Sequence, residues 1–539
     1  AIKNWNKAIE INPNFAEAYN NRGNVYLVLK KFNEAIYNYK KAIDIEPKYS
    51  EAYNNLGNGF VNLEKIKEAL ENYYKAIEIN PNFAEAYNSI GNVYFKLNEL
   101  DKAINHYKKA ININPNYAQA HYSYACILLK FKNLEKSVEI FNKTIEINPN
   151  FAEAYNSLGN ALLLLNRTEQ AFESYNKAIK LKPDYAGAYF NRAYAFDKFN
   201  RLEESINSYQ TAYNINPEFN FLLGTLVHEK ARICDWNFLT KYLKELKNKI
   251  IKFEKVSSPF PITHLFDSPQ LQRISAETWI KYNFSTKNKL AHPLKTNFEK
   301  KIRIGYYSKD FRNHAIGHLI SHLFKLHDKS KFETYAFYFG NNDSGEHDNI
   351  TKKILRDVDR FVDVKLKNDL ELVKLSRELK IDIAIDLMGF TAENRFQIFF
   401  ERCAPIQVNY LGYPGTSGSN CMDYIIADKT IIPKENQKFF SEKIAYMPHT
   451  YQVNDFTKQI SKKIFTREEF GLPKDAFVFC CFNQNYKINP ETFDLWIEIL
   501  NSVKDSVLWL FEDNSIASEN LKKEAQLRGL NPNRIIFAK

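Results

Sequence analysis

The sequence lacks three features that would point to common classes of function. No apolar run in its 539 residues approaches the roughly 18 to 20 residues that cross a bilayer, so we expect no membrane partner. None of its six cysteines forms a C-x-x-C pair, which argues against a disulfide framework or a zinc site and favours a reducing cytoplasm. No block of about five or six basic residues carries the net charge of +11. We interpret that charge as a dispersed Lys-rich surface and expect no nucleic-acid partner.

What the sequence does have is a strict internal period. The string INPNFAEAYN at 11–20 returns at 79–88 and 147–156, and prolines recur every 34 residues at Pro13, Pro47, Pro81, Pro115, Pro149, Pro183 and Pro217. A 34-residue period is typical of tetratricopeptide repeats, in which two helices form each unit and proline ends the second. We therefore predict a tetratricopeptide α-superhelix over residues 1–217.

Small and large residues recur within this period as packed helix pairs require. The three registers are glycine at Gly23, Gly57, Gly91 and Gly159, alanine at Ala35, Ala69, Ala103 and Ala171, and a ring at Tyr39, Tyr73, Tyr107, Phe141, Tyr175 and Tyr209. Small residues let the helices approach closely, and a single unit cannot bury its apolar face alone. Ala1 aligns with Ala35, so the first repeat is partial and we expect the chain to be a fragment at its N-terminus.

The period ends after Pro217, and residues 218–299 then have the apolar pattern of a helical linker. Beyond it, short β-rich runs alternate with helical stretches, which favours a parallel doubly wound sheet; the runs are 302–307, 334–339, 381–387, 406–410 and 424–427. We predict an α plus α/β chain, with a Rossmann-like domain at 300–470 and the start of a second one at 471–539. Strands at 477–482, 506–511 and 534–537 belong to the second. Only about 65 of its residues precede Lys539, so we expect it to be truncated.

Four strings carry a resemblance to a known family. They are IRIGYYSKDFRNH at 302–314, APIQVNYLGYPGTSG at 404–418, MDYIIAD at 422–428 followed by SEKIAYMPH at 441–449, and CFNQNYKINP at 481–490 followed by SVLWL at 506–510. In this order, behind tetratricopeptide repeats, they resemble the O-linked N-acetylglucosamine transferase family, to which SPINDLY-like proteins belong.

The resemblance implies two Rossmann-like domains with a nucleotide sugar in the cleft between them. Members transfer N-acetylglucosamine from UDP-N-acetylglucosamine to Ser or Thr of intracellular proteins, with inversion at the anomeric centre and without a metal or other cofactor. Such chemistry needs a group that orients the acceptor hydroxyl and positive charge against the leaving diphosphate. The implied partners are protein or peptide acceptors and the nucleotide sugar.

His314 is the candidate for the group beside the acceptor hydroxyl, with Asp310 as its orienting or proton-accepting partner. His264, in the string FPITH at 260–264, resembles a second histidine of the family's cleft. A lone loop histidine is more often structural, and only the matching motif favours the catalytic interpretation. His318 and His322 follow at four-residue steps, but no carboxylate or cysteine has matching spacing, so we expect no metal site.

Candidates for the nucleotide-sugar site come from two of the strings. Lys487 matches the family lysine that neutralises the diphosphate, and Gln484 and Tyr486 match positions in the sugar pocket. A turn after the 406–410 run resembles the loop that borders the sugar, where glycine permits close approach of backbone to ligand; its candidates are Leu411, Gly412 and Pro414. The alternative for this turn is a tight turn without a ligand.

In the family, asparagines two positions after the repeat tyrosine grip the main chain of the protein substrate. An amide suits this task because it both donates and accepts hydrogen bonds. The register here holds Asn21, Asn55 and Asn191, which we predict to bind peptide, and Ser89, Ser123 and Ser157. A second column, Asn24, Asn58, Asn92 and Asn160, is an alternative face. Polar residues that merely solvate the inner helices are the other interpretation.

Two departures from the family leave alternatives open. The family's basic and hydroxyl residues that hold UDP lie beyond Lys539, which leaves the activity of the chain by itself undecided. Ala315 and Ile316 follow His314 where animal members carry Pro and Thr. Related enzymes transfer fucose or a hexose, and the sequence does not distinguish the donor. A peptide-binding scaffold with an inactive transferase domain is the remaining alternative, against which stands the retention of His314, Asp310 and Lys487.

Overall fold

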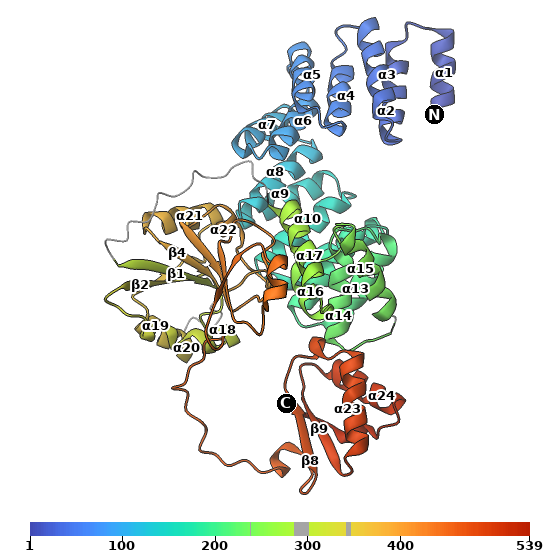
Figure 1. Cartoon of the computed structure of the whole chain (residues 1–539). Coiled ribbons are helices and arrows are strands. Elements are labelled where there is room, and N and C mark those ends of the chain that lie inside the picture. Colours follow the sequence, from blue (N-terminus) through green and yellow to red (C-terminus); the bar gives the residue numbers. More distant parts are fainter. Residues whose placement is uncertain (238, 285–300, 341–346, 539) are drawn as a thin grey trace. The chain divides into compact units, whose positions relative to one another are not determined.

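The structure is a computed structural model that describes residues 1–237, 239–284, 301–340 and 347–538. It divides into two compact units, Ala1–Ile215 and Asn216–Lys539 (Figure 1). Of the predicted linker, residues 238 and 285–299 lie outside the described residues, as does Lys539. None of the helices that the described residues form combines the length and the apolar character that a bilayer span requires.

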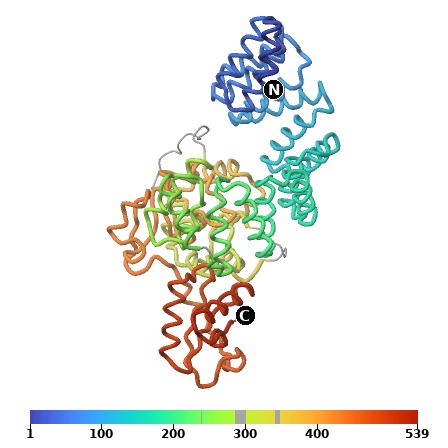
Figure 2. Tube along the Cα trace, turned by 90° about the vertical axis from the view of Figure 1, so that its right-hand side faces the viewer, coloured from blue at the N-terminus to red at the C-terminus, as the bar shows by residue number. Residues whose placement is uncertain are grey.

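The first unit is a stack of helix pairs, which confirms the predicted repeat array (Figures 1 and 2). Each second helix of a pair ends two residues before one of the repeat prolines, because proline cannot continue the helix. The helices are α1 (Ile2–Ile11), α2 (Ala16–Val28), α3 (Phe32–Ile45), α4 (Ser50–Asn62), α5 (Ile66–Ile79), α6 (Ala84–Lys96), α7 (Leu100–Ile113), α8 (Ala118–Lys130), α9 (Leu134–Ile147), α10 (Ala152–Leu164), α11 (Thr168–Leu181), α12 (Ala186–Lys198) and α13 (Leu202–Ile215).

The predicted packing registers of this array are also confirmed. The six repeat rings are buried, and the alanines beside them are completely buried. A Cβ built on Gly23 would lie 2.6 Å from the ring of Tyr39, and the other three repeat glycines meet their rings in the same way. In these four repeats the ring occupies space that a glycine on the facing helix leaves open, and the same register holds Ala125 and Ala193 in two others.

The second unit begins with four helices, α14 (Leu222–Arg232), α15 (Leu239–Ile251), α16 (Pro259–Leu265) and α17 (Pro269–Asn283). A proline opens α16 and another opens α17, a position where its missing N–H costs nothing. Ser268 caps α17 by accepting the backbone N–H of Leu271. Buried Ala276 of α17 belongs to the hydrophobic core of the sheet that follows, so this helix forms part of the cover of that sheet.

The sheet has seven parallel strands in the order β3-β2-β1-β4-β5-β6-β7, which confirms the predicted parallel sheet. The strands are β1 (Ile302–Ser308), β2 (Phe332–Tyr338), β3 (Arg360–Asp363), β4 (Ile383–Asp386), β5 (Ile406–Asn409), β6 (Tyr424–Ala427) and β7 (Lys443–Tyr446). Five of them match the predicted runs. The sequence did not indicate β3 and β7, which are short edge strands that begin with a charged residue.

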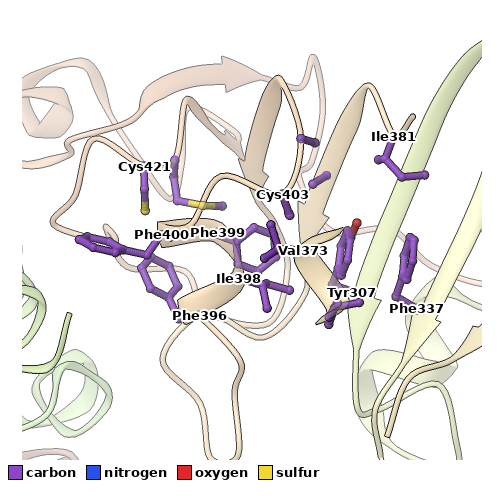
Figure 3. Packing of buried hydrophobic residues seen from close by; sticks show 14 of the residues in the cluster. Tyr307, Phe337, Val373, Ile381, Phe396, Ile398, Phe399, Phe400, Cys403 and Cys421 are labelled. Atoms are coloured by element: carbon purple, nitrogen blue, oxygen red, sulfur yellow. The ribbon is translucent and has the colours of Figure 1, made fainter. Parts of the chain in front are cut away.

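Helices cover both faces of this sheet (Figure 1). One layer comprises α18 (Ala315–Ile320), α19 (Leu323–Leu326) and α20 (Asn349–Asp357), and the other comprises α21 (Asp369–Glu378) and α22 (Gln397–Phe400). Figure 3 shows the core beneath the second layer, where the rings of Tyr307 and Phe337 stack with centroids 4.5 Å apart. Phe399 meets the ring of Tyr307 edge-on from α22.

A second, three-stranded parallel sheet has the order β10-β9-β8. It comprises β8 (Phe477–Cys481), β9 (Ser506–Phe511) and β10 (Ile535–Ala538), near the predicted positions, with α23 (Pro490–Ser502) and α24 (Ser515–Leu527) packed on one face. Cys234 and Trp236, which follow α14, complete the hydrophobic core of this sheet. The helical segment is thus joined to both sheets by buried side chains.

Candidate functional site

The seven-stranded sheet reverses its direction of growth between β1 and β4. From β1 the chain continues outward through β2 and β3, and from β4 it continues through β5, β6 and β7 on the other side. At such a point the loops that leave the carboxyl ends of the two central strands diverge, and ligands bind in the crevice they leave. The loop after β1 carries Asp310 and His314, so the structure places this predicted pair at the switch point.

Asp310 and His314 lie against each other in this loop. His314 Nδ1 is 3.5 Å from Asp310 Oδ2, and Arg312 Nε is 3.6 Å from Oδ1 of the same carboxylate. The carboxylate is buried, and its Oδ1 has no hydrogen-bond partner among the described residues. The Ser308 hydroxyl accepts the backbone N–H of Asp310, which fixes the turn at the end of β1. A buried carboxylate with spare acceptor capacity therefore faces the imidazole.

His314 stands at the N-cap of α18 and is partly exposed. Its Nδ1 lies 3.3 Å from the backbone N–H of Ile316, so it either accepts this bond or carries a proton that it shares with Asp310. Burial lowers the pKa of His314 below its ordinary value, and the charge of Asp310 offsets only part of this effect. The imidazole is consequently neutral near pH 7. With its Nδ1 proton toward Asp310, Nε2 is free to accept a proton from a hydroxyl.

The two histidines that follow His314 have partners of their own. His318 Nε2 lies 2.8 Å from Asn313 Oδ1, and the ring of His322 lies edge-on to Phe456 with its Nδ1 3.9 Å from Asp455. The described residues contain no group of three or more His, Cys, Asp or Glu side chains that could hold a metal ion.

The turn after β5 is held firmly in place. Leu411 has a left-handed backbone with φ 67°, and a Cβ on Gly412 would lie 1.9 Å from the carbonyl oxygen of Leu387. Further along, the buried carboxylate of Glu442 accepts the N–H of Ser417 and the hydroxyl of Thr416. The close approach of the Leu387 carbonyl is by itself a structural reason for glycine at position 412. In this turn Pro414 is exposed, and Leu411 and Gly412 are half-buried. All three residues lie at the carboxyl edge of the sheet, where they follow β5.

Asp386, the last residue of β4, lies at the same edge, and sequence reasoning did not single it out. It is buried, its Oδ1 accepts the N–H of Met388, and its Oδ2 has no hydrogen-bond partner among the described residues. Burial raises the pKa of Asp386 to about 6. The available signal was a carboxylate near the end of the apolar run 381–387, which also contains Asp382.

His264 lies in a second group of residues, where four rings from three elements meet. We call His228 of α14, Phe260 and His264 of α16, and Tyr486 of η3 (Asn485–Lys487) the ring cluster. The ring of Tyr486 has its centroid 4.7 Å from that of His264 and 5.3 Å from that of His228. The Nδ1 atom of His228 lies 3.0 Å from Nε2 of His264. Burial lowers the pKa of both histidines, that of His264 to about 4.

The predicted donor-site residues Lys487 and Gln484 border this cluster. Both side chains are exposed, and the Lys487 ammonium lies 5.9 Å from the ring centroid of Tyr486. The residues that follow α14 anchor this segment: the Cys234 thiol donates to the carbonyl of Asn485 in η3, and the carbonyl of Ile233 accepts from Asn520 of α24. A cationic side chain is thereby held at an open surface beside half-buried rings.

The structure thus gathers the predicted residues into two groups. Asp310 and His314 lie at the switch point, and His264, Tyr486 and Lys487 lie at the ring cluster. No hydrogen bond, ion pair or ring contact among the described residues joins one group to the other. Phe260 contacts both regions: it belongs to the ring cluster, and it also packs on the hydrophobic core of the seven-stranded sheet.

The two asparagine columns of the repeat array differ in what they bond. In the second column, each side-chain oxygen accepts the hydroxyl of a buried repeat tyrosine, as Asn58 does from Tyr73 at 2.7 Å; the same bond forms at Asn24, Asn92 and Asn160. In the first column, Asn55 and Asn191 donate to Asn20 and Asn156 of the preceding first helices, and Asn21, Asn55 and Asn191 are half-buried. The second column is therefore committed to internal packing.

Comparison with known proteins places the second half of the chain in a family. Residues 255–465 and 458–539, more than half of the chain, match the Glycosyl transferase family 41. The chain belongs to glycosyl transferase family 41. The first half matches tetratricopeptide repeats at residues 1–30, 16–49, 58–98, 91–130, 118–151, 140–173, 159–198 and 186–219.

Relatives of this family-41 chain carry names of one kind. It is 36% identical over 244 residues to the "Probable UDP-N-acetylglucosamine--peptide N-acetylglucosaminyltransferase SEC" of Arabidopsis thaliana, over 44% of this chain and 25% of that protein. It is 28% identical over 434 residues to the UDP-N-acetylglucosamine--peptide N-acetylglucosaminyltransferase of Caenorhabditis elegans, over 57% of this chain and 37% of that protein. These alignments cover well under half the length of each relative.

A solved structure shares the fold of this family-41 chain. A mutant of the Thermobaculum terrenum O-GlcNAc transferase superimposes with a TM-score of 0.50 at 22% sequence identity, over 78% of this chain and 74% of that one. At this identity the likeness extends to the fold, a repeat array followed by parallel-sheet domains.

Proposed function

We propose that this protein is a glycosyltransferase that transfers N-acetylglucosamine from UDP-N-acetylglucosamine to Ser or Thr side chains of proteins, with inversion and without a metal. The observation that carries the proposal is the match of residues 255–539 to glycosyl transferase family 41. The names of its relatives in Arabidopsis thaliana and Caenorhabditis elegans support the donor and the peptide acceptor. The free cysteines support a reducing compartment such as the cytoplasm.

The geometry at the switch point supports a role for His314 as general base. Its neutral imidazole lies beside the buried carboxylate of Asp310, which orients it and stabilises the proton that it takes up. The acceptor hydroxyl loses its proton to Nε2 as its oxygen attacks the anomeric carbon, and the bond from that carbon to the diphosphate breaks on the opposite face. The strand order of the sheet, which we interpret as Rossmann-like, supports a ligand crevice at this edge.

Lys487 is the proposed partner of the leaving diphosphate. Its exposed ammonium beside Tyr486 supplies positive charge where the leaving diphosphate gains a negative charge as its bond to the sugar breaks, so that no metal is required for this step. Gln484 and Tyr486 complete the proposed donor site, with the turn at Leu411, Gly412 and Pro414 on the sheet side. The half-buried amides of Asn21, Asn55 and Asn191 are the proposed grip on the acceptor's main chain.

The test uses the protein expressed from its own gene, so that its ends are the natural ones. It is incubated with UDP-N-acetylglucosamine and cytosolic proteins, and the products are weighed by intact-mass spectrometry beside a Lys487→Ala variant. We expect addition of one N-acetylhexosamine, lost in the variant. Addition of a deoxyhexose from GDP-fucose or a hexose from UDP-glucose instead would replace the donor in the proposal. No addition from any of the three donors would leave a peptide-binding scaffold as the better account.

A further inference from the structure

The proposed function assigns no part to His228, although this residue contacts the three other members of the ring cluster. Its ring centroid lies 4.8 Å from that of His264, 5.3 Å from that of Tyr486 and 5.9 Å from that of Phe260. Its Nδ1 atom is 3.0 Å from Nε2 of His264, the distance of a hydrogen bond. A histidine on α14 therefore joins α16 to the segment that carries Tyr486 and Lys487.

The two imidazoles form a neutral pair. Burial disfavours the charged form of each, and the Lys487 ammonium further lowers the pKa of His264. One neutral ring donates its N–H to the bare nitrogen of the other, so a single proton is shared along the contact. The other nitrogen of His264, Nδ1, is buried without a hydrogen-bond partner among the described residues. Both nitrogens of His264 thus face protein, which suits support of a neighbour better than proton transfer to a substrate.

The neighbour that needs support is η3. It is a three-residue 3-10 helix held by the backbone bonds from Lys487 to Gln484 and from Ile488 to Asn485. A segment this short takes its position from side-chain packing rather than from its own hydrogen bonds. Two anchors come from α14 and the residues after it, the His228 contact on one side and the Cys234 thiol bonded to the Asn485 carbonyl on the other.

We propose that His228 is a positioning residue, which through its hydrogen bond to His264 holds Tyr486 and so places the Lys487 ammonium. The functional half of this inference rests on the proposed function, in which Lys487 meets the donor diphosphate. Without the bond, the ring of His264 loses one of the contacts that fix it, and Tyr486 packs on a less ordered surface. The ammonium of Lys487 then samples a wider range of positions.

The first test measures local order and needs no substrate. His228→Phe keeps an aromatic ring in place and removes the hydrogen-bonding nitrogen, while His228→Asn places an amide near the former Nδ1 position. Loss of one hydrogen bond should speed hydrogen–deuterium exchange at residues 484–488 by about fivefold in the Phe variant. We expect the Asn variant to recover part of the protection. The matched control is His327→Phe, which removes the bond between His327 and the Tyr306 hydroxyl elsewhere in the unit.

A double-substitution cycle decides whether His228 acts through His264. If it does, His228→Phe combined with His264→Phe should exchange at residues 484–488 no faster than His264→Phe alone. Effects that multiply in the double variant, or exchange in His228→Phe equal to that of the wild type, would overturn the inference.

The second readout is the binding of UDP-N-acetylglucosamine, followed by calorimetry. A displaced Lys487 should weaken donor binding several-fold in His228→Phe but not in His327→Phe, whereas a merely structural histidine would lower thermal stability and leave donor affinity intact. Unchanged affinity despite faster exchange would overturn the placement of Lys487 by this pair. A wild-type protein inert toward every donor would defeat the proposed function, and the exchange experiment would still decide the role of His228.

Discussion

A methyl group on Gly412 would lie 1.9 Å from the carbonyl oxygen of Leu387. Gly412 belongs to the turn after β5 and Leu387 directly follows β4, so two loops at the carboxyl edge of the sheet meet through their backbones. Leu411 beside it holds a left-handed φ of 67°, which costs a non-glycine residue about 1 kcal/mol or more. The turn therefore stores strain and depends on glycine whether or not it borders a ligand.

Replacement of Gly412 by alanine should accordingly destabilise the second unit. The obstacle is backbone, which cannot turn aside as a side chain does, so we expect the free energy of unfolding to fall by about 1–3 kcal/mol. The measurement is thermal unfolding followed by calorimetry. The control is Gly187→Ala in α12, where the added methyl meets the side chain of Tyr185 at 3.0 Å and alanine favours the helix. A Gly412→Ala protein as stable as the wild type would show that the two loops separate easily.

Asp386 makes the stability of the second unit depend on pH in an unusual direction. Its folded-state pKa is about 6, whereas the carboxyl in an unfolded chain titrates near 3.8. Between these values the unfolded state binds fewer protons than the folded state, so the free energy of unfolding falls as pH rises through this window. A difference of about 2 in pKa corresponds to roughly 3 kcal/mol, lost once the pH exceeds 6.

The variant Asp386→Asn should remove this loss while its amide oxygen still accepts the Met388 N–H. We expect equal stability of the two proteins at pH 4 and a more stable variant at pH 7, with urea unfolding as the measurement. Other titrating groups contribute equally to both proteins and cancel in the difference. A stability difference that does not change with pH would mean that Asp386 is ionised in the folded protein at every pH tested.

The array could be predicted in detail because its signal is repeated. The 34-residue period placed the helices, the prolines at their ends and the buried rings. The turns within the pairs carry a mixed signal. Left-handed backbone falls at Asn98, Asn166 and Asn200, a residue type that tolerates it, but also at Lys30, Glu64 and Lys132, which do not indicate it. In the sheet, central strands appeared as apolar runs, whereas edge strands β3 and β7 did not, since half of their surface faces water.

The site was predictable only where a motif covers it. Asp310 and His314 share one string, and Tyr486 and Lys487 share another. His228 could not be found from sequence, because its partner His264 lies on a different helix and no local spacing connects them. Asp386 could not be identified from the sequence, because a carboxylate at a strand end is common. Its raised pKa comes from burial in the tertiary structure.

The acid limb of the pH–activity profile should report His314. A general base must be neutral to act, so activity rises as pH passes through its pKa, which burial holds below the usual value of 6.5. Asp310 raises that pKa and Arg312 lowers it. We therefore expect Asp310→Asn to move the acid limb to lower pH and Arg312→Gln to move it to higher pH. His314→Ala should lower kcat by about 10²–10⁴.

The matched pair Asp310→Asn and Arg312→Gln checks this assignment without relying on loss of activity. Each substitution removes one charge that acts on the pKa of His314, and the two charges have opposite signs, so the expected shifts are opposite. Measurement of kcat/KM from pH 5 to 8 would show them. Shifts in the same direction, or an acid limb that neither variant moves, would assign the essential base elsewhere.

The two asparagine columns of the array should separate binding from stability. Asn55 is half-buried and belongs to the column proposed to grip acceptor main chains, whereas Asn58 accepts the hydroxyl of buried Tyr73. Asn55→Ala should weaken the binding of an acceptor protein, since one main-chain grip is lost. It also removes the hydrogen bond that Asn55 donates to Asn20, which costs about 0.5–1.5 kcal/mol of folding free energy. Asn58→Ala leaves the buried hydroxyl of Tyr73 without a hydrogen-bond partner, which costs about 1–3 kcal/mol of folding free energy and leaves the affinity for the acceptor protein largely intact.

Fluorescence anisotropy with a labelled acceptor protein, beside calorimetric melting, measures both effects. If Asn58→Ala instead weakened binding more than Asn55→Ala at a temperature where both are folded, the acceptor would lie along the second column.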